Sequence, residues 1–97
     1  MNLVLLPEAE ADLDEAIDHY IDEASAAVAA DLQREVRRVA ALLCEWPSLG
    51  HKVGVHARAF GLKRFPYQLV YRLTTDAVVI VAIAHERRDP RYWRGRA

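Results

Sequence analysis

The chain has 97 residues, a single cysteine and a formal net charge of −1. This length suits one domain with its own core, so we expect a single domain over 1–97, and the lone cysteine excludes an internal disulfide. No apolar run of about 18 residues is present to span a membrane, and the opening residues lack the basic-then-apolar pattern of a signal peptide, so we expect a cytoplasmic protein.

The N-terminal half predicts a short strand and two helices. An apolar run over 2–6 has the length of a strand, and Pro7 suits the first position of a helix, where its missing N–H costs nothing. Apolar residues at helical spacing then predict a helix over 7–24. Ser25 can cap a second helix, whose apolar stripe runs to Trp46 before a proline ends it. With almost no linker between them, the helices form a hairpin, and we expect both apolar stripes in the core.

The C-terminal half predicts strands and a short helical turn. The stretch 55–65 has the character of a strand interrupted at Gly61. The stretch 67–73 alternates apolar and less apolar residues, which is typical of a half-buried strand. Val and Ile fill 77–84, which indicates a central strand covered on both faces. A helical turn is expected near 90–94.

These elements predict an α+β fold of the order β-α-α-β-β-β, with the helix hairpin packed on one face of a mainly antiparallel sheet. The pattern does not place the first strand in the sheet. If Phe65 and Pro66 form a two-residue turn, Arg64 lies opposite Tyr67. The face that packs on the helices then carries Phe60, Leu62, Tyr67, Leu69, Tyr71, Val78, Ile80 and Ala82.

The opposite face of this sheet is predicted to carry an apolar strip with basic ends. Its residues are Lys63, Gln68, Val70, Arg72, Val79, Val81, Ile83 and His85. We expect this strip to be exposed, because no other segment of this short chain is long enough to cover it. A one-residue shift of register would exchange the two faces.

Charge divides sharply between the two halves of the chain. Residues 1–50 contain eleven acidic and three basic residues, whereas residues 51–97 contain ten basic and three acidic ones. Such asymmetry favours a polyanion or an acidic partner for the basic half. The alternative is an acidic helix that complements a basic sheet within the molecule.

The basic half also suggests chemistry without a metal or cofactor. A Gly-rich phosphate loop and a metal-spaced Cys/His set are absent from the sequence, so we expect neither a cofactor nor a metal. Histidine or tyrosine could move protons in RNA cleavage while arginine stabilises the charged phosphate. The candidate catalytic residues are Lys63, Arg64, Arg72, His85, Arg87 and Tyr92. Alternatively, Arg87 and Arg88 cap strand ends and pair with carboxylates of the first helix.

Short motifs follow one another in order along nearly the whole chain. They are Pro7-Glu8-Ala9, Pro47-Ser48-Leu49-Gly50, Arg58, Tyr67, Tyr71, Arg72, Ala84-His85, Arg87-Arg88-Asp89-Pro90 and Trp93. Each motif is weak alone, but the ordered set resembles the RelE/ParE family, the toxins of bacterial type II toxin–antitoxin modules.

The resemblance implies one of two activities. RelE-like members cut mRNA on the ribosome, and ParE-like members inhibit DNA gyrase. The long helix hairpin and the absence of an overall basic charge favour the ParE-like reading, a plasmid-stabilisation toxin that binds gyrase and is not an enzyme. The alternatives are a metal-independent, ribosome-dependent mRNA endoribonuclease and a module whose only partner is an antitoxin.

The apolar strip with basic ends would serve as the binding surface for an antitoxin. The predicted antitoxin-binding residues are Val70, Arg72, Val79, Val81, Ile83, Arg87 and Arg88. An antitoxin segment with apolar anchors and acidic residues would complement this surface and fold as it binds. The result would be a toxin–antitoxin hetero-oligomer of undetermined stoichiometry.

Overall fold

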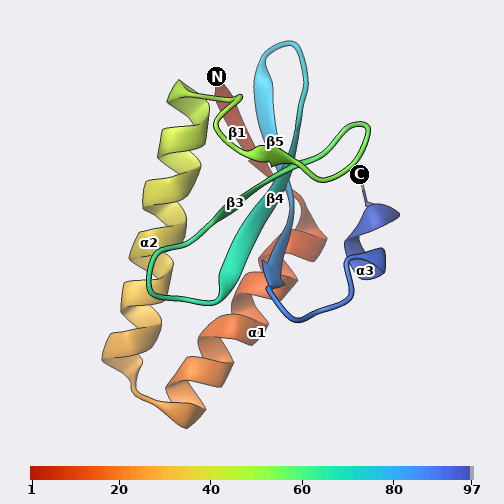
Figure 1. Ribbon diagram of the computed structural model, residues 1–97. Helices are drawn as coiled ribbons and strands as arrows, with labels where there is room; N and C mark the ends of the chain where they lie inside the picture. The colour runs from red at the N-terminus through yellow and green to blue at the C-terminus, as the bar shows by residue number, and fades with distance from the viewer. Residues whose placement is uncertain (97) are drawn as a thin grey trace.

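The computed structural model describes residues 1–96 and packs two long helices against a five-stranded sheet (Figure 1). The elements are β1 (Asn2–Leu5), α1 (Pro7–Glu23), α2 (Ala26–Glu45), β2 (His51–Lys52), β3 (Arg58–Gly61), β4 (Tyr67–Leu73), β5 (Ala77–His85) and α3 (Arg91–Arg94). The predicted α+β class and element order are confirmed, with the short strand β2 in addition. Within residues 1–96, no helix is both long and apolar enough to cross a membrane.

Both helices begin where the sequence predicts. Pro7 opens α1 after an uncapped Leu6, and the Ser25 side chain accepts a hydrogen bond from the Val28 N–H at the start of α2. The buried residues of α2 recur at helical spacing: Ala29, Leu32, Val36, Val39, Ala40 and Leu43. Trp46 is 63% exposed, so its predicted place in the core is wrong. It lies just past the last helical turn, where the apolar stripe no longer faces the sheet.

The sheet order is β1-β5-β4-β3-β2, which places β5 next to two neighbours. β1 pairs with β5 in parallel, from Asn2 opposite Ala77 to Leu5 opposite Ile80, and the other three pairs are antiparallel. This settles the position of the first strand, which the sequence left open. Every residue of β5 except the last is buried, as its uniform apolar composition predicts.

The turn between β3 and β4 is longer than predicted. Phe60 pairs with Leu69 and Gly61 with Gln68, so the expected two-residue turn and its pairing are wrong. Arg64 adopts a φ of 74°, in the left-handed region. The turn has this form because it folds back onto α2, with Phe65 buried in the core.

A β-bulge in β5 changes which side chains face the helices. The pairing of β4 with β5 shifts by one residue at this point and leaves Val81 as the extra residue. An extra residue reverses the alternation of side chains beyond it. Ile83 therefore packs in the core beneath the helices and Ala82 on the opposite face. His85 lines a cleft together with residues of α1. The predicted faces of these three residues are thus wrong.

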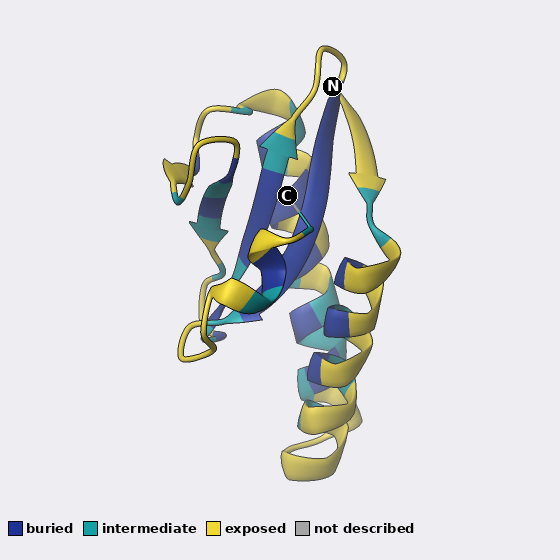
Figure 2. Cartoon of the chain, turned by 90° about the vertical axis from the view of Figure 1, so that its right-hand side faces the viewer, coloured by how far each residue is buried: buried dark blue, intermediate teal, exposed yellow. Residues whose placement is uncertain are grey.

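The sheet face away from the helices is covered by the chain itself. Val70, Val79 and Val81 are buried in a second core, together with Trp93 of α3, which is 3% exposed. In Figure 2 the central strands are coloured as buried, and α3 lies in front of them. The prediction of an exposed strip at Val70, Val79, Val81 and Ile83 is wrong, because one tryptophan and the segment before β3 suffice to cover a narrow sheet.

Candidate functional site

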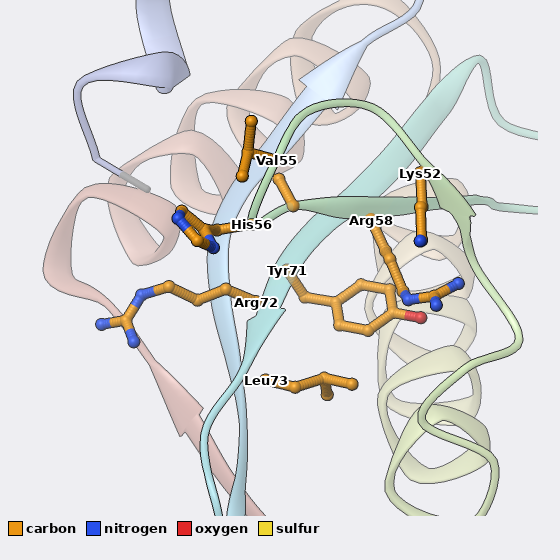
Figure 3. Close-up of a pocket in the computed structure, with 8 residues that line it drawn as sticks. Lys52, Val55, His56, Arg58, Tyr71, Arg72 and Leu73 are labelled. Carbon is orange, nitrogen blue, oxygen red and sulfur yellow. The ribbon is translucent and has the colours of Figure 1, made fainter.

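A cleft lined by cations lies over β2, β3 and β4, and we call it the basic cleft (Figure 3). Its volume is about 440 Å³. It is lined by Lys52, Val55, His56, Ala57, Arg58, Tyr71, Arg72 and Leu73. Four of these eight residues are Lys, Arg or His, and none carries a carboxylate. The cleft is therefore suited to an anionic group.

Strand register brings these side chains together. Lys52 of β2 lies opposite Arg58 of β3, and Arg58 lies opposite Tyr71 of β4. Arg72 follows Tyr71 on the same strand and therefore points to the opposite face of the sheet, so the cleft extends round the end of β4. Figure 3 shows Lys52 and Arg58 to one side of the Tyr71 ring and His56 and Arg72 to the other. The sequence placed these residues in separate segments, and only the sheet joins them.

Tyr71 joins one wall of the basic cleft to the loop after α2 through two hydrogen bonds. Its hydroxyl donates to the Pro47 carbonyl at 2.7 Å and accepts from the Gly50 N–H at 2.9 Å. Burial raises the pKa of Tyr71 and so favours the protonated form. A Cβ on Gly50 would lie 2.6 Å from the hydroxyl oxygen, so only glycine permits this approach.

Arg58 is held in place by backbone oxygens. Its Nη1 donates to the Gly50 carbonyl at 2.7 Å and to the Ser48 carbonyl at 3.2 Å. Its other guanidinium nitrogens make no hydrogen bond within the described part of the chain. Arg58 therefore presents a positioned cation with donors to spare.

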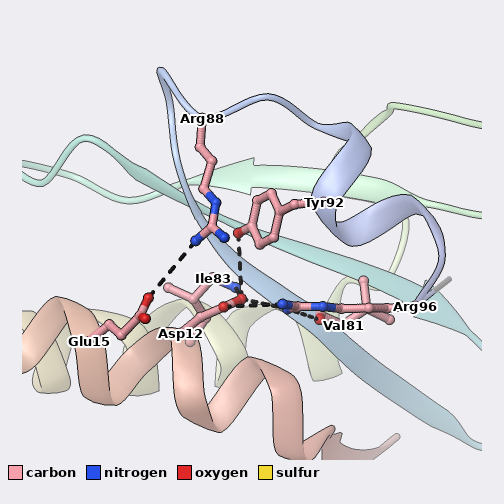
Figure 4. Close-up of polar contacts among 7 residues, drawn as sticks. All are labelled: Asp12, Glu15, Val81, Ile83, Arg88, Tyr92 and Arg96. Carbon is pink, nitrogen blue, oxygen red and sulfur yellow. Dashed lines mark hydrogen bonds and ion pairs between the residues drawn. The ribbon is translucent and has the colours of Figure 1, made fainter.

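A second polar cluster ties the C-terminal segment to α1 (Figure 4). The buried Asp12 carboxylate accepts from Arg96 Nη1 at 2.7 Å and from the Ile83 N–H at 3.1 Å. Arg96 Nη1 also donates to the Val81 carbonyl at 3.2 Å. β1 pairs with β5 only as far as Ile80, so these two side chains satisfy backbone groups beyond the end of β1.

Tyr92 and Arg88 complete this cluster. The Tyr92 hydroxyl donates to Asp12 at 3.5 Å, and burial, with the Asp12 charge, raises the pKa of Tyr92 to about 12. The Arg88 guanidinium lies 3.6 Å from the centre of the Tyr92 ring. Arg88 also pairs with Glu15 of α1 at 3.9 Å, as the internally complementary alternative predicts.

Lys63 and Arg64 belong to the turn that folds onto α2. The Lys63 N–H donates to Glu35 at 2.6 Å, and Arg64 donates to Asp31 at 2.8 Å. The Arg64 hydrogen bond is the main cause of the lowered pKa of Asp31. Arg38 is the main cause of the lowered pKa of Glu35. The Arg64 side chain therefore has a structural role at the helix surface, whereas Lys63 contributes its backbone N–H to this contact.

His85 lies in another cleft, of about 210 Å³, beside α1. Its ring meets that of Tyr67 edge-on at 5.1 Å, and its Nδ1 accepts from the Arg87 N–H at 3.1 Å. The candidate catalytic residues are therefore dispersed. Lys63 and Arg64 lie at α2, and Arg72 lies in the basic cleft. His85 lines the cleft beside α1, where Tyr92 contacts the lining residues Asp12 and Arg88. Arg87 lies on an exposed loop.

Sequence reasoning missed Asp12, Arg96 and Lys52. Asp12 is one of the many acidic residues of the first half, yet it shares the buried stripe of α1 with Ala9 and Ala16. That spacing was the available signal. Its partner Arg96 lies 84 residues away in the chain, which no local pattern reveals.

Apolar surface is exposed at the opposite edge of the sheet. A groove of about 400 Å³ runs between β1 and α2. It is lined by Leu3, Leu5, Leu13, Val36, Arg37, Ala40, Ala41, Leu69 and Ile80. Leu3 of this lining is exposed, and Val4, which follows it on β1, is exposed on the other face of the strand.

Comparisons with known proteins agree with this fold. A family model described as the ParE toxin of a type II toxin–antitoxin system, parDE, matches residues 3–90. Ten chains of solved structures match. One, from the chromosomal ParDE TA system of P. aeruginosa, has a TM-score of 0.79 at 23% identity, covering 88% of this chain and 95% of that one. No curated protein matches. Because the family model spans almost the whole sequence, this chain belongs to the family of ParE toxins of type II toxin–antitoxin systems.

Proposed function

We propose that the chain inhibits bacterial growth by binding DNA gyrase in the cytoplasm, that a cognate antitoxin neutralises it, and that the module stabilises a plasmid. Membership of the ParE toxin family supports the toxin role. The observation that favours a binding mechanism over RNA cleavage is the dispersal of the candidate catalytic residues.

Metal-free RNA cleavage needs proton-transferring and charge-stabilising groups around a single phosphate. Lys63 and Arg64 precede β4, whereas Arg72 lies at its far end. Arg72 lies five residue steps along the strand from Tyr67, which corresponds to about 17 Å. The β-bulge places His85 in the cleft beside α1, away from Arg72. A toxin that acts by binding does not require these groups to converge.

The proposed antitoxin contact keeps the basic residues predicted from the sequence but uses a different apolar surface. Arg72, Arg87 and Arg88 remain candidate contacts, and the last two are exposed. The buried Val70, Val79, Val81 and Ile83 could reach a partner only if the segments covering them moved. The groove between β1 and α2 offers exposed apolar surface for antitoxin anchors without such a movement.

Two assays on the purified chain test this proposal together. One measures DNA supercoiling by gyrase, and the other maps mRNA cuts in a translating extract. We expect inhibition of supercoiling and intact mRNA. Cuts that disappear on Arg72→Ala or His85→Ala substitution would establish the endoribonuclease alternative. Activity in neither assay would leave antitoxin binding as the only function and contradict the proposal.

A further inference from the structure

We propose that the basic cleft binds an acidic peptide segment of a protein partner, with an apolar side chain of that segment packed against Val55. The proposed function takes Arg72 as one candidate contact, and the inference adds the other cations of the cleft and the chemistry of the segment that fits them. The inference rests on the proposed function only in taking the partner to be a protein.

The cations of the cleft lack counter-charges. Lys52, Arg58 and Arg72 form no ion pair with any carboxylate in residues 1–96, whereas Arg64 and Arg96 each have one. Lys52 and Arg58 also lie directly opposite each other on neighbouring strands. Like charges in that position destabilise a sheet, and a bound carboxylate would relieve the repulsion.

The cleft is also organised before any ligand arrives. Two backbone carbonyls accept hydrogen bonds from Arg58 Nη1. The Nε–H and Nη2–H groups remain, and together they can donate a pair of hydrogen bonds to one carboxylate. A cation that is already fixed loses little side-chain freedom on binding. This geometry suits Asp or Glu side chains.

An apolar component lies at the rim. Val55 is 92% exposed at the tip of a loop that the Val53 N–H closes onto the Ala57 carbonyl at 3.0 Å. A second hollow of about 220 Å³ lies on the other side of this loop, and Arg94 and Trp93 line it. An extended segment could cross the loop tip, cover Val55 and meet a further cation.

The same features disfavour a nucleic acid. Single strands bind through exposed aromatic side chains on which bases stack, but Tyr71 and Trp93 are buried, which within residues 1–96 leaves His56 as the one exposed ring that lines the two hollows. The chain has a net charge of −1 with eleven acidic residues in its first half, so a long phosphate backbone gains no general attraction. A short acidic peptide places its negative charges over the cleft alone, so the acidic first half of the chain does not repel it.

The test measures binding of a fluorescein-labelled 12-residue peptide of Glu with two central Leu residues, by anisotropy at low salt. We expect Arg72→Glu to weaken binding about fivefold or more. Arg37→Glu is the matched control, because it changes the net charge equally at an exposed arginine of the opposite groove. We expect little change from it. Val55→Ser should weaken binding of this peptide but not of an all-Glu peptide.

Three outcomes would overturn the inference. Equal losses of affinity in the Arg72→Glu and Arg37→Glu variants would mean that binding depends only on net charge. Undetectable binding of the peptide would show that the cleft is not a binding site for it. A single-stranded oligonucleotide of equal charge that binds more tightly and depends on Arg72 would make the ligand a nucleic acid. Circular dichroism checks that each variant is folded. Gyrase takes no part in the peptide-binding assay. The proposal on the basic cleft and the proposal on gyrase can therefore fail independently of each other.

Discussion

Tyr71 and Gly50 form a contact that tolerates almost no change. The hydroxyl of Tyr71 satisfies both the Gly50 N–H and the Pro47 carbonyl. An added Cβ on Gly50 would lie 2.6 Å from this hydroxyl and 2.9 Å from the Ala59 carbonyl oxygen. The first is a buried side chain and the second is backbone, so neither can yield easily.

We therefore expect Gly50→Ala to lower the free energy of unfolding by about 2 kcal/mol, the usual cost of overpacking. Urea titration of the purified variant measures the loss. Gly54→Ala is the matched control, because a Cβ there meets no atom within 4 Å. Equal stability of the two variants would show that the Tyr71 contact does not constrain the loop.

Tyr92 makes stability depend on alkaline pH. Its pKa is raised to about 12 in the folded chain from about 10 in an unfolded one. A raised pKa means that folding favours the protonated phenol. The contribution of the protonated Tyr92 side chain to the free energy of unfolding is therefore complete below about pH 10, and it is lost as the pH rises towards 12.

The expected result is a free energy of unfolding that falls more steeply between about pH 10 and pH 12 in the parent chain than in the Tyr92→Phe variant. The tyrosines with raised pKa at positions 67 and 71 are present in both chains, so the comparison isolates Tyr92. Ultraviolet difference titration should assign the highest phenol pKa to Tyr92. Identical pH profiles would contradict the burial of this hydroxyl against Asp12.

The short helix α3 matters to the fold because it closes the second core. Trp93 covers the sheet face that carries Val70, Val79 and Val81. We expect Trp93→Ala to lower the free energy of unfolding by about 3–5 kcal/mol and to increase binding of a hydrophobic dye. The control is Trp46→Ala, because Trp46 is 63% exposed. Comparable losses from both tryptophans would mean that α3 does not cover this face.

Periodicity was sufficient to predict the elements but not all of their pairing. The apolar steps of α2 and the alternation in β4 follow directly from which face each element buries. β5 is apolar at almost every position, so no change of pattern marks the bulge at Val81. The faces of Ala82, Ile83 and His85 were consequently misassigned.

The candidate site was predictable only in part. The family resemblance pointed to Arg58, Tyr71 and Arg72, which do line the basic cleft. Lys52 joins them through a two-residue strand, too short to give a periodic signal. The cover over the valines was missed because we expected that covering them would need a longer segment, whereas one buried tryptophan, Trp93, and the residues before β3 are enough.

Charge is separated across the whole molecule, and it is only partly neutralised within it. Arg88 pairs with Glu15, and Arg96 pairs with Asp12, so part of the basic half complements α1. The cations of the basic cleft remain without a carboxylate in residues 1–96. The acidic first helix and the basic cleft therefore present surfaces of opposite charge.

The central claim is that this ParE-family chain stops growth by acting on gyrase and not on mRNA. The most direct measurement is the topoisomer distribution of a reporter plasmid after induced expression in bacteria, resolved on chloroquine gels. The account predicts that the plasmid loses negative supercoils as growth stops, and that co-expressed antitoxin prevents the loss. Growth arrest with an unchanged topoisomer distribution would contradict it.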